Sequence, residues 1–248
     1  WQRGYVMNLS FSNDRPDREA AVIQSYIDRN VDGMIVFPVS KDHTAIDTMQ
    51  RAGKAVVCVL NDVAISNASV VVANERGGMA ALTRHVIELG HRRIAYINGY
   101  LHYSETYNDY VNVERLAGYT ETLRRNGIEP DPRVIVEFNP ELYRTGDYSL
   151  LEALLRGDPV PTAIQCFHDQ IAIWVLQGLK ELGVRVPEDV SVTGFDDIRE
   201  LKYIEPRLTT CAIQSTEVAS EAVRSLFRLM DQPANARERT VVSTQLAV

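Results

Sequence analysis

The order of apolar segments is the feature that most constrains how this chain can fold. Short apolar segments recur along the sequence, and longer stretches with helical spacing of their apolar side chains separate them. This order is typical of βαβ units, which build parallel sheets covered by helices. The sequence therefore predicts an α/β protein, and its 248 residues leave room for two lobes of ordinary size.

The expected elements follow from this alternation. We expect strands at Tyr5–Leu9, Gly33–Phe37, Ala55–Val59, Val70–Val72, Ile94–Ile97, Val134–Glu137, Ala163–Cys166 and Val190–Thr193. We expect helices at Asp17–Asn30, Lys41–Ala52, Arg76–Leu89, Val113–Asn126, Asp147–Arg156, Asp169–Leu182 and Thr216–Asp231. The stretch Asn98–Asn112 is rich in Tyr, Asn and acidic residues, so we expect a long loop there.

Composition and charge narrow the classes of function. A net charge of −7 argues against nucleic acid binding by this segment itself, because such binding needs basic clusters. No apolar run approaches the roughly 20 residues of a membrane helix, and no signal peptide is visible. The cysteines Cys58, Cys166 and Cys211 stand singly in apolar runs, which indicates buried reduced thiols, a cytoplasmic location and no metal site.

Polar side chains at strand ends are the candidate site. Asp196 and Asp197 follow the expected strand Val190–Thr193, and Gly194 is expected to turn the chain sharply away from that strand. Ligands bind at the carboxyl edge of open α/β sheets. Motifs for nucleotide, phosphate, zinc or serine-hydrolase chemistry are missing, so we expect one of the two carboxylates to contact a ligand and neither to catalyse a reaction.

Three further residues belong to this expected edge, each with an ordinary alternative. Arg115 could hold a hydroxyl pair with its planar guanidinium, or it could be a solvated surface residue. Tyr148 could stack on a sugar ring, or it could simply pack in the protein. His168 follows the strand Ala163–Cys166 and could contact the ligand, whereas the adjacent Asp169 is expected to be the N-cap of the next helix.

Four short motifs, in order, resemble the effector-binding domain of the lactose/galactose-repressor (LacI/GalR) family. They are Gly90-His91-Arg92-Arg93-Ile94-Ala95, Arg115-Leu116-Ala117-Gly118, Val186-Pro187-Glu188-Asp189-Val190-Ser191-Val192-Thr193-Gly194-Phe195-Asp196-Asp197, and Pro206-Arg207-Leu208-Thr209-Thr210. The resemblance implies a two-lobed, periplasmic-binding-protein-like (type I) fold in which each lobe is a parallel sheet flanked by helices. It assigns residues 1–72 plus 213–232 to the N-terminal lobe and residues 73–212 plus 233–248 to the C-terminal lobe.

The same resemblance implies the function. We expect the effector-sensing and dimerisation domain of a bacterial transcriptional regulator, with a sugar or sugar-like molecule in the cleft between the lobes. The expected ligand residues are Arg115, Asp196, His168, Tyr148 and, just beyond the strand Ala55–Val59, Asp62. Similar domains commonly have Asn where this chain has His168, so their ligand preference does not transfer. No cofactor is expected.

Partners and alternatives complete the expectation. The family implies a homodimer, here through Val22, Tyr26 and Ile46 on the first two helices, and operator DNA bound by an N-terminal headpiece that this chain lacks. Similar domains also have a strand and helix before the segment matching Gly4–Asn13, and we expect them in the biological protein. The closest alternative is an exported sugar-binding protein of a transporter; an α/β enzyme is a third.

Overall fold

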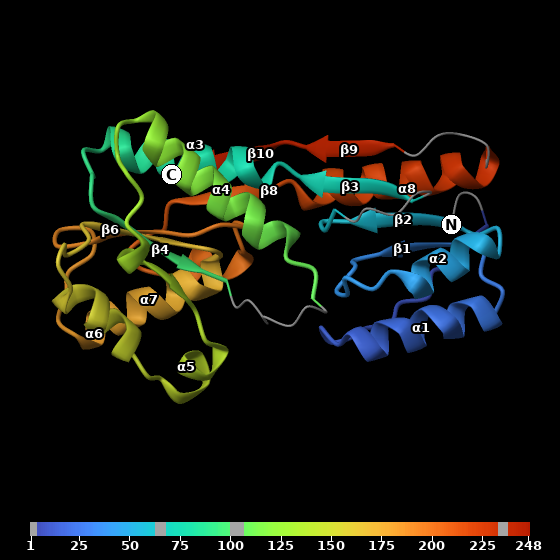
Figure 1. The fold of residues 1–248 in the computed structure, drawn as a ribbon, viewed down its shortest axis with the longest axis horizontal. Helices are drawn as coiled ribbons and strands as arrows, with labels where there is room; N and C mark the ends of the chain where they lie inside the picture. Colours follow the sequence, from blue (N-terminus) through green and yellow to red (C-terminus); the bar gives the residue numbers. More distant parts are fainter. Residues whose placement is uncertain (1–3, 63–67, 100–106, 233–237) are drawn as a thin grey trace. The chain divides into compact units, whose positions relative to one another are not determined.

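Two compact units make up the structure, a computed structural model that describes residues 4–62, 68–99, 107–232 and 238–248 (Figure 1). The first unit comprises Trp1–Val72, Tyr103–Asn108 and Thr216–Val241. The second comprises Ala73–His102, Asp109–Ser215 and Val242–Val248. Each unit contains a sheet built from parallel strand pairs, with helices packed on it, which confirms the predicted α/β class.

The first unit is built on a sheet of order β1-β2-β3-β9. Its elements are α1 (Pro16–Asp28), β1 (Gly33–Val36), α2 (Thr44–Arg51), β2 (Ala55–Val59), β3 (Ser69–Ala73), α8 (Ser215–Asp231) and β9 (Arg239–Val242). β2 lies parallel to both β1 and β3, and its central residues are fully buried. The core of this unit therefore forms where the helices cover β2 and β3.

The expected strand Tyr5–Leu9 is wrong. Residues 4–12 form no helix or strand, and Val6, Met7 and Leu9 are 79%, 85% and 70% exposed. An apolar segment becomes a strand only when a neighbouring strand takes up its backbone hydrogen bonds. β1, at the end of the sheet, pairs only with β2 among the described residues and not with this segment.

The second unit contains the sheet β5-β4-β6-β7, whose neighbouring strands are all parallel. Its elements are α3 (Glu75–Glu88), β4 (Ile94–Asn98), α4 (Tyr110–Arg125), η1 (Pro132–Val134), β5 (Ile135–Glu137), α5 (Pro140–Thr145), α6 (Ser149–Arg156), β6 (Ala163–Cys166), α7 (Asp169–Glu181), β7 (Ser191–Thr193), η2 (Arg199–Tyr203), β8 (Thr210–Ile213) and β10 (Thr244–Ala247). β10 pairs antiparallel with β8.

Helices cover both faces of this second sheet. α6 and α7 pack on one face in a core that includes Leu151, Trp174 and Val175. α3 and α4 pack on the other, around Met79 and Tyr119 (Figure 1). Both faces are therefore buried, as parallel sheets require, and only the strand ends remain free to carry a site.

Glycines determine two local details of the helices. The helix expected at Asp147–Arg156 is observed as α6, and the short helix α5, which was not expected, precedes it and ends at Gly146, which takes a left-handed conformation. Gly118 lets α4 approach α3 closely, since a Cβ there would lie 2.4 Å from the Arg76 carbonyl oxygen.

The compact units also differ from the expected lobes at three places. Residues 103–108 belong to the first unit, so does the chain from α8 as far as Val241, and residues 213–215 belong to the second unit. The physical reason for the extension to Val241 is strand pairing: Val70 N donates to the Glu238 carbonyl, and Asn74 N donates to the Val242 carbonyl. The chain returning from α8 therefore adds β9 to the first sheet before it reaches β10.

Candidate functional site

The site lies at the carboxyl edge of the second unit's sheet. Because β4, β5, β6 and β7 are parallel, their carboxyl ends meet along one edge. Phe138 follows β5, Phe167 and His168 follow β6, and Phe195 and Asp196 follow β7. This is the edge at which open α/β sheets bind ligands.

Arg115 is the centre of a buried cluster at this edge. Its Nε donates to Glu75 Oε2 at 2.7 Å, and its Nη2 donates to Asp196 Oδ1 at 2.9 Å. Its Nη1 donates to the Phe167 carbonyl at 2.5 Å. The guanidinium carbon also lies 3.9 Å from the centre of the Phe195 ring and 4.6 Å from that of Phe167. We call these five residues the Arg115 cluster.

Burial controls the charges in the Arg115 cluster. The Arg115 side chain is only 4% exposed and that of Glu75 1%, whereas the Asp196 side chain is 30% exposed. Burial raises the pKa of both the Glu75 and the Asp196 carboxyl, and the guanidinium opposes that shift. One cation therefore serves two carboxylates, and only Asp196 is open to a ligand. Arg115 itself is buried, so the alternative of a solvated surface residue is wrong.

The backbone beyond β7 is strained where the site lies. Asp196 has φ of 107° and Asp197 has φ of 57°, a region that side-chain-bearing residues rarely adopt. Such strain is concentrated at functional sites. The expected role of Gly194 in the turn is not observed. A Cβ on Gly194 would lie 2.1 Å from Asp169 Oδ1, so this glycine gives room to a buried carboxylate.

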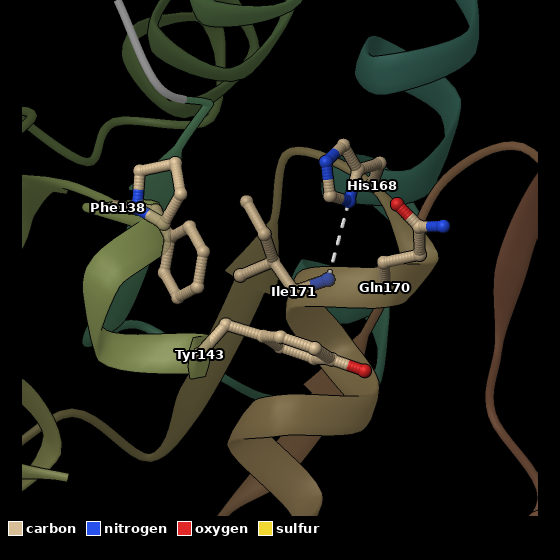
Figure 2. A pocket seen from close by; sticks show the side chains of 6 residues that line it. Phe138, Tyr143, His168, Gln170 and Ile171 are labelled. Carbon is tan, nitrogen blue, oxygen red and sulfur yellow. Dashed lines mark hydrogen bonds between the residues drawn. The ribbon is translucent and has the colours of Figure 1, made fainter. Parts of the chain in front are cut away.

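A pocket of about 300 Å³ opens next to the Arg115 cluster. Figure 2 shows aromatic side chains on one side of this pocket and the first turn of α7 on the other. We call it the His168 pocket, and it is lined by Phe138, Pro140, Tyr143, His168, Gln170 and Ile171. Its walls come from the β5–α5 connection, from α5 and from the β6–α7 connection.

His168 is fixed in one protonation state by its place at the start of α7. Its Nδ1 accepts a hydrogen bond from Ile171 N at 3.1 Å, so His168 is the N-cap of the helix. Burial and the nearby Arg115 charge lower the His168 pKa to about 4. The neutral ring must then carry its proton on Nε2. This nitrogen is turned away from Ile171, toward the Phe138 side of the pocket (Figure 2).

Asp169, expected as the N-cap, has a different role. It is the first residue of α7 and is fully buried. Its carboxylate accepts from Thr210 Oγ1 at 2.7 Å and from Ile198 N at 3.0 Å. Burial raises the pKa of this carboxyl to about 6. Asp169 thus ties α7 to the segment that follows β7 and to the first residue of β8.

Two other expected ligand residues are not among the described residues that line the His168 pocket. Tyr148, at the start of α6, has its ring centroid 5.5 Å from that of Trp174, which is the packing alternative. Asp62 belongs to the first unit, where it accepts from Arg239 Nε at 2.6 Å. Of the five expected residues, the structure brings together Arg115, Asp196 and His168.

The sequence analysis missed Phe138, Tyr143 and Gln170. Phe138 immediately follows the strand Val134–Glu137, so its position at a strand end was a usable signal. Tyr143 lies on α5, a short helix that was not among the expected elements. In the described part of the chain, no group of His, Cys, Asp or Glu is arranged to hold a metal ion. No helix there is long and apolar enough to cross a membrane.

Comparison with known proteins identifies the class of domain. A family model for the periplasmic binding protein-like domain matches residues 83–248. The transcriptional repressor PurR of Vibrio atlanticus is 27% identical over 241 residues, covering 96% of this chain and 69% of that protein. The ribose operon repressor of Haemophilus influenzae is 33% identical over 176 residues, covering 71% and 50%.

A solved structure agrees with these relatives. The complex of the transcriptional regulator CelR with cellobiose is 27% identical and has a TM-score of 0.81, covering 94% of this chain and 69% of that one. The chain thus belongs to the periplasmic binding protein-like domain family, in the form found in LacI/GalR regulators, as its motifs predicted. It spans between half and about seven tenths of the length of these relatives.

Proposed function

We propose that this chain is the effector-sensing domain of a bacterial transcriptional regulator, and that its effector is a sugar or sugar-like molecule. The observation that carries the proposal is the His168 pocket beside the Arg115 cluster. Together they offer a hydrogen-bond donor at His168, a partly exposed acceptor at Asp196 and an aromatic wall at Phe138 and Tyr143. Few polar groups on a largely apolar wall are typical of small-molecule sites.

The relatives support a regulator over the two alternatives. PurR and the ribose operon repressor are named as repressors, and CelR as a transcriptional regulator. These names favour neither a transporter's sugar-binding protein nor an enzyme. The sugar class is supported by the cellobiose in the CelR complex and by the name of the ribose operon repressor.

The regulatory mechanism is part of the proposal. A ligand shifts a protein between two states only by as much as its affinity for them differs. We infer that the effector's binding energy biases the conformation of this domain, and that a DNA-binding segment outside these 248 residues converts the bias into a change in operator affinity. Homodimerisation belongs to the same proposal.

A thermal-shift screen tests the effector class. Pentoses, hexoses, disaccharides and sugar acids are added to the protein at concentrations up to 100 times the expected Kd, which stabilises a binding protein by about 2.7 kcal/mol. We expect at least one sugar to raise the melting temperature, and Asp196→Asn to reduce that rise. If only nucleotides or amino acids stabilise the protein, the effector is not a sugar, although the chain would still be a sensor.

A further inference from the structure

Among the described residues that line the His168 pocket, none has a charged side chain. His168 is the only titratable group among these described residues besides the Tyr143 phenol, and its Nδ1 is held as an acceptor by Ile171 N. An N–H on Nε2 and the Gln170 amide are therefore neutral hydrogen-bonding groups for a ligand. Groups of this kind recognise hydroxyl and carbonyl oxygens without requiring a charge on the ligand.

The cation beside this pocket, Arg115, is already engaged within the protein. Each of its three guanidinium nitrogens donates one hydrogen bond to a protein acceptor, and the side chain is only 4% exposed. Two carboxylates, Glu75 and Asp196, share this one positive charge, and Asp197 is exposed just beyond them. The described groups around this edge thus carry an excess of negative charge.

The start of α7 could oppose this conclusion, because a helix N-terminus attracts anions. In α7, groups of the protein itself already occupy the N–H groups and the positive end of the helix. Ile171 N donates to His168, Ala172 N donates to the His168 carbonyl, and the Asp169 carboxyl is buried in the first turn. The balance of charge still disfavours an anionic ligand.

We propose that the part of the effector held in the His168 pocket is uncharged, and that Tyr143 on α5 is a specificity-determining residue for it. This inference rests on the proposed function and narrows it to neutral sugars, excluding their phosphates and acids. Tyr143 is 60% exposed and its ring forms a wall of the pocket opposite His168 (Figure 2). An aromatic face there packs against the apolar face of a sugar ring.

Calorimetric titration with matched ligands tests the charge preference. Ribose is compared with ribose 5-phosphate, and glucose with glucose 6-phosphate and gluconate, on the wild-type chain. We expect any neutral sugar that binds to do so at least tenfold more tightly than its charged derivatives. Gln170→Arg places a cation at the pocket and should reduce that ratio by about tenfold. Gln177→Arg adds the same charge on an exposed position of α7 away from the pocket and should leave the ratio unchanged.

Two variants of Tyr143 test its role. Tyr143→Ala should weaken binding of the neutral sugar by about tenfold, whereas Tyr143→Phe retains the ring and should change it by less than about threefold. Circular dichroism checks that each variant is folded.

A phosphate or acid that binds the wild type as tightly as its neutral partner overturns the charge preference while leaving the proposed function intact. Equal binding by Tyr143→Ala overturns the role of Tyr143. If no sugar of either kind binds, the proposed function itself falls, and this inference falls with it.

Discussion

Arg115 shows how a residue can be important for a ligand site without lying on its surface. Its guanidinium holds Glu75, Asp196 and the Phe167 carbonyl together from a position that is almost fully buried. It therefore orients Asp196, the one member of the cluster that is partly open to a ligand. Loss of this cation would leave the Glu75 carboxylate buried without a partner.

Arg115→Ala is accordingly expected to destabilise the fold, and not merely to weaken ligand binding. Removing one partner of a buried ion pair costs about 3–5 kcal/mol, because an uncompensated charge remains. Urea denaturation measures this loss. Arg76→Ala is the matched control: its side chain is 44% exposed and pairs with Glu114 and Glu121, and it should cost less than about 1 kcal/mol. Equal costs for the two variants would show that the Arg115 cluster does not stabilise the fold.

His168 gives a prediction about pH. The folded-state pKa of about 4 lies below the ordinary value of 6.5, so the unfolded chain binds protons more readily between these values. The stability that His168 contributes is therefore fully present above pH 6.5 and is lost as the pH falls toward 4. His168→Asn keeps a side chain that can cap α7 but cannot titrate.

The measurement is the difference in unfolding free energy between wild type and His168→Asn at pH 7 and at pH 4. Between pH 7 and pH 4, the unfolding free energy of the wild type should fall relative to that of His168→Asn by up to about 3 kcal/mol. Asp169 shifts stability in the opposite direction, because its pKa is raised to about 6. Since Asp169 is present in both proteins, its contribution cancels in the difference. A difference that does not vary with pH would mean that His168 is not buried as a neutral ring.

At the scale of elements, the sequence pattern located buried strands well and misjudged elements that depend on distant partners. The strand Ala163–Cys166 agrees with β6 to the residue, and all four of its residues are buried, so both of its faces lie in the core. Tyr5–Leu9 has an equally apolar pattern but no hydrogen-bonding partner among the described residues. The strand propensity of a segment depends on its own residues, whereas its pairing depends on a strand that can lie far away in the sequence.

The candidate site was predictable to a similar extent. Topology brings the residues after β6 and β7 to one edge, and this placed His168 and Asp196 correctly. Tyr143 was missed because it lies on α5, a helix of six residues that was not among the expected elements. The N-cap at His168 was missed for a different reason: Asp is a commoner cap than a His ring nitrogen.

The open edge of β1 supports a further prediction at this scale. Ile35 and Phe37 are 39% and 45% exposed beside it, and the neighbouring segment 5–11 exposes several large apolar side chains. Exposed edges of this kind invite pairing with another strand. We expect a β-strand from a part of the protein outside these 248 residues to pair along β1 and to cover this surface.

Hydrogen exchange can test for that strand. In the 248-residue chain, amides of residues 5–11 should exchange at nearly unprotected rates. In a longer form of the protein that carries the preceding segment, they and the amides of β1 should become protected, since they would then be hydrogen-bonded in a wider sheet. Amides of β6, in the other unit, serve as the internal reference. Identical exchange in both forms would argue that no further strand joins β1.

At the scale of the whole molecule, the remaining question is what covers α1. Only Glu19 and Ile23 are buried on this helix, whereas Val22 and Tyr26 stay partly exposed. Ile46, expected with them as a dimer contact, is instead 1% exposed and belongs to the core. Of the three residues expected at the dimer contact, Val22 and Tyr26 on α1 therefore remain candidates.

We expect the protein to form a homodimer in which this face of α1 is buried. Light scattering at micromolar concentration should give twice the chain mass of 27.9 kDa. Val22→Asp places a charge on the proposed interface and should shift the mass toward that of the monomer, because burying an unpaired carboxylate opposes association. Leu89→Asp changes a 64% exposed apolar residue in the second unit and should leave the mass unchanged. A wild-type mass near 27.9 kDa would contradict the dimer, and a dimer unaffected by Val22→Asp would place the interface on another surface.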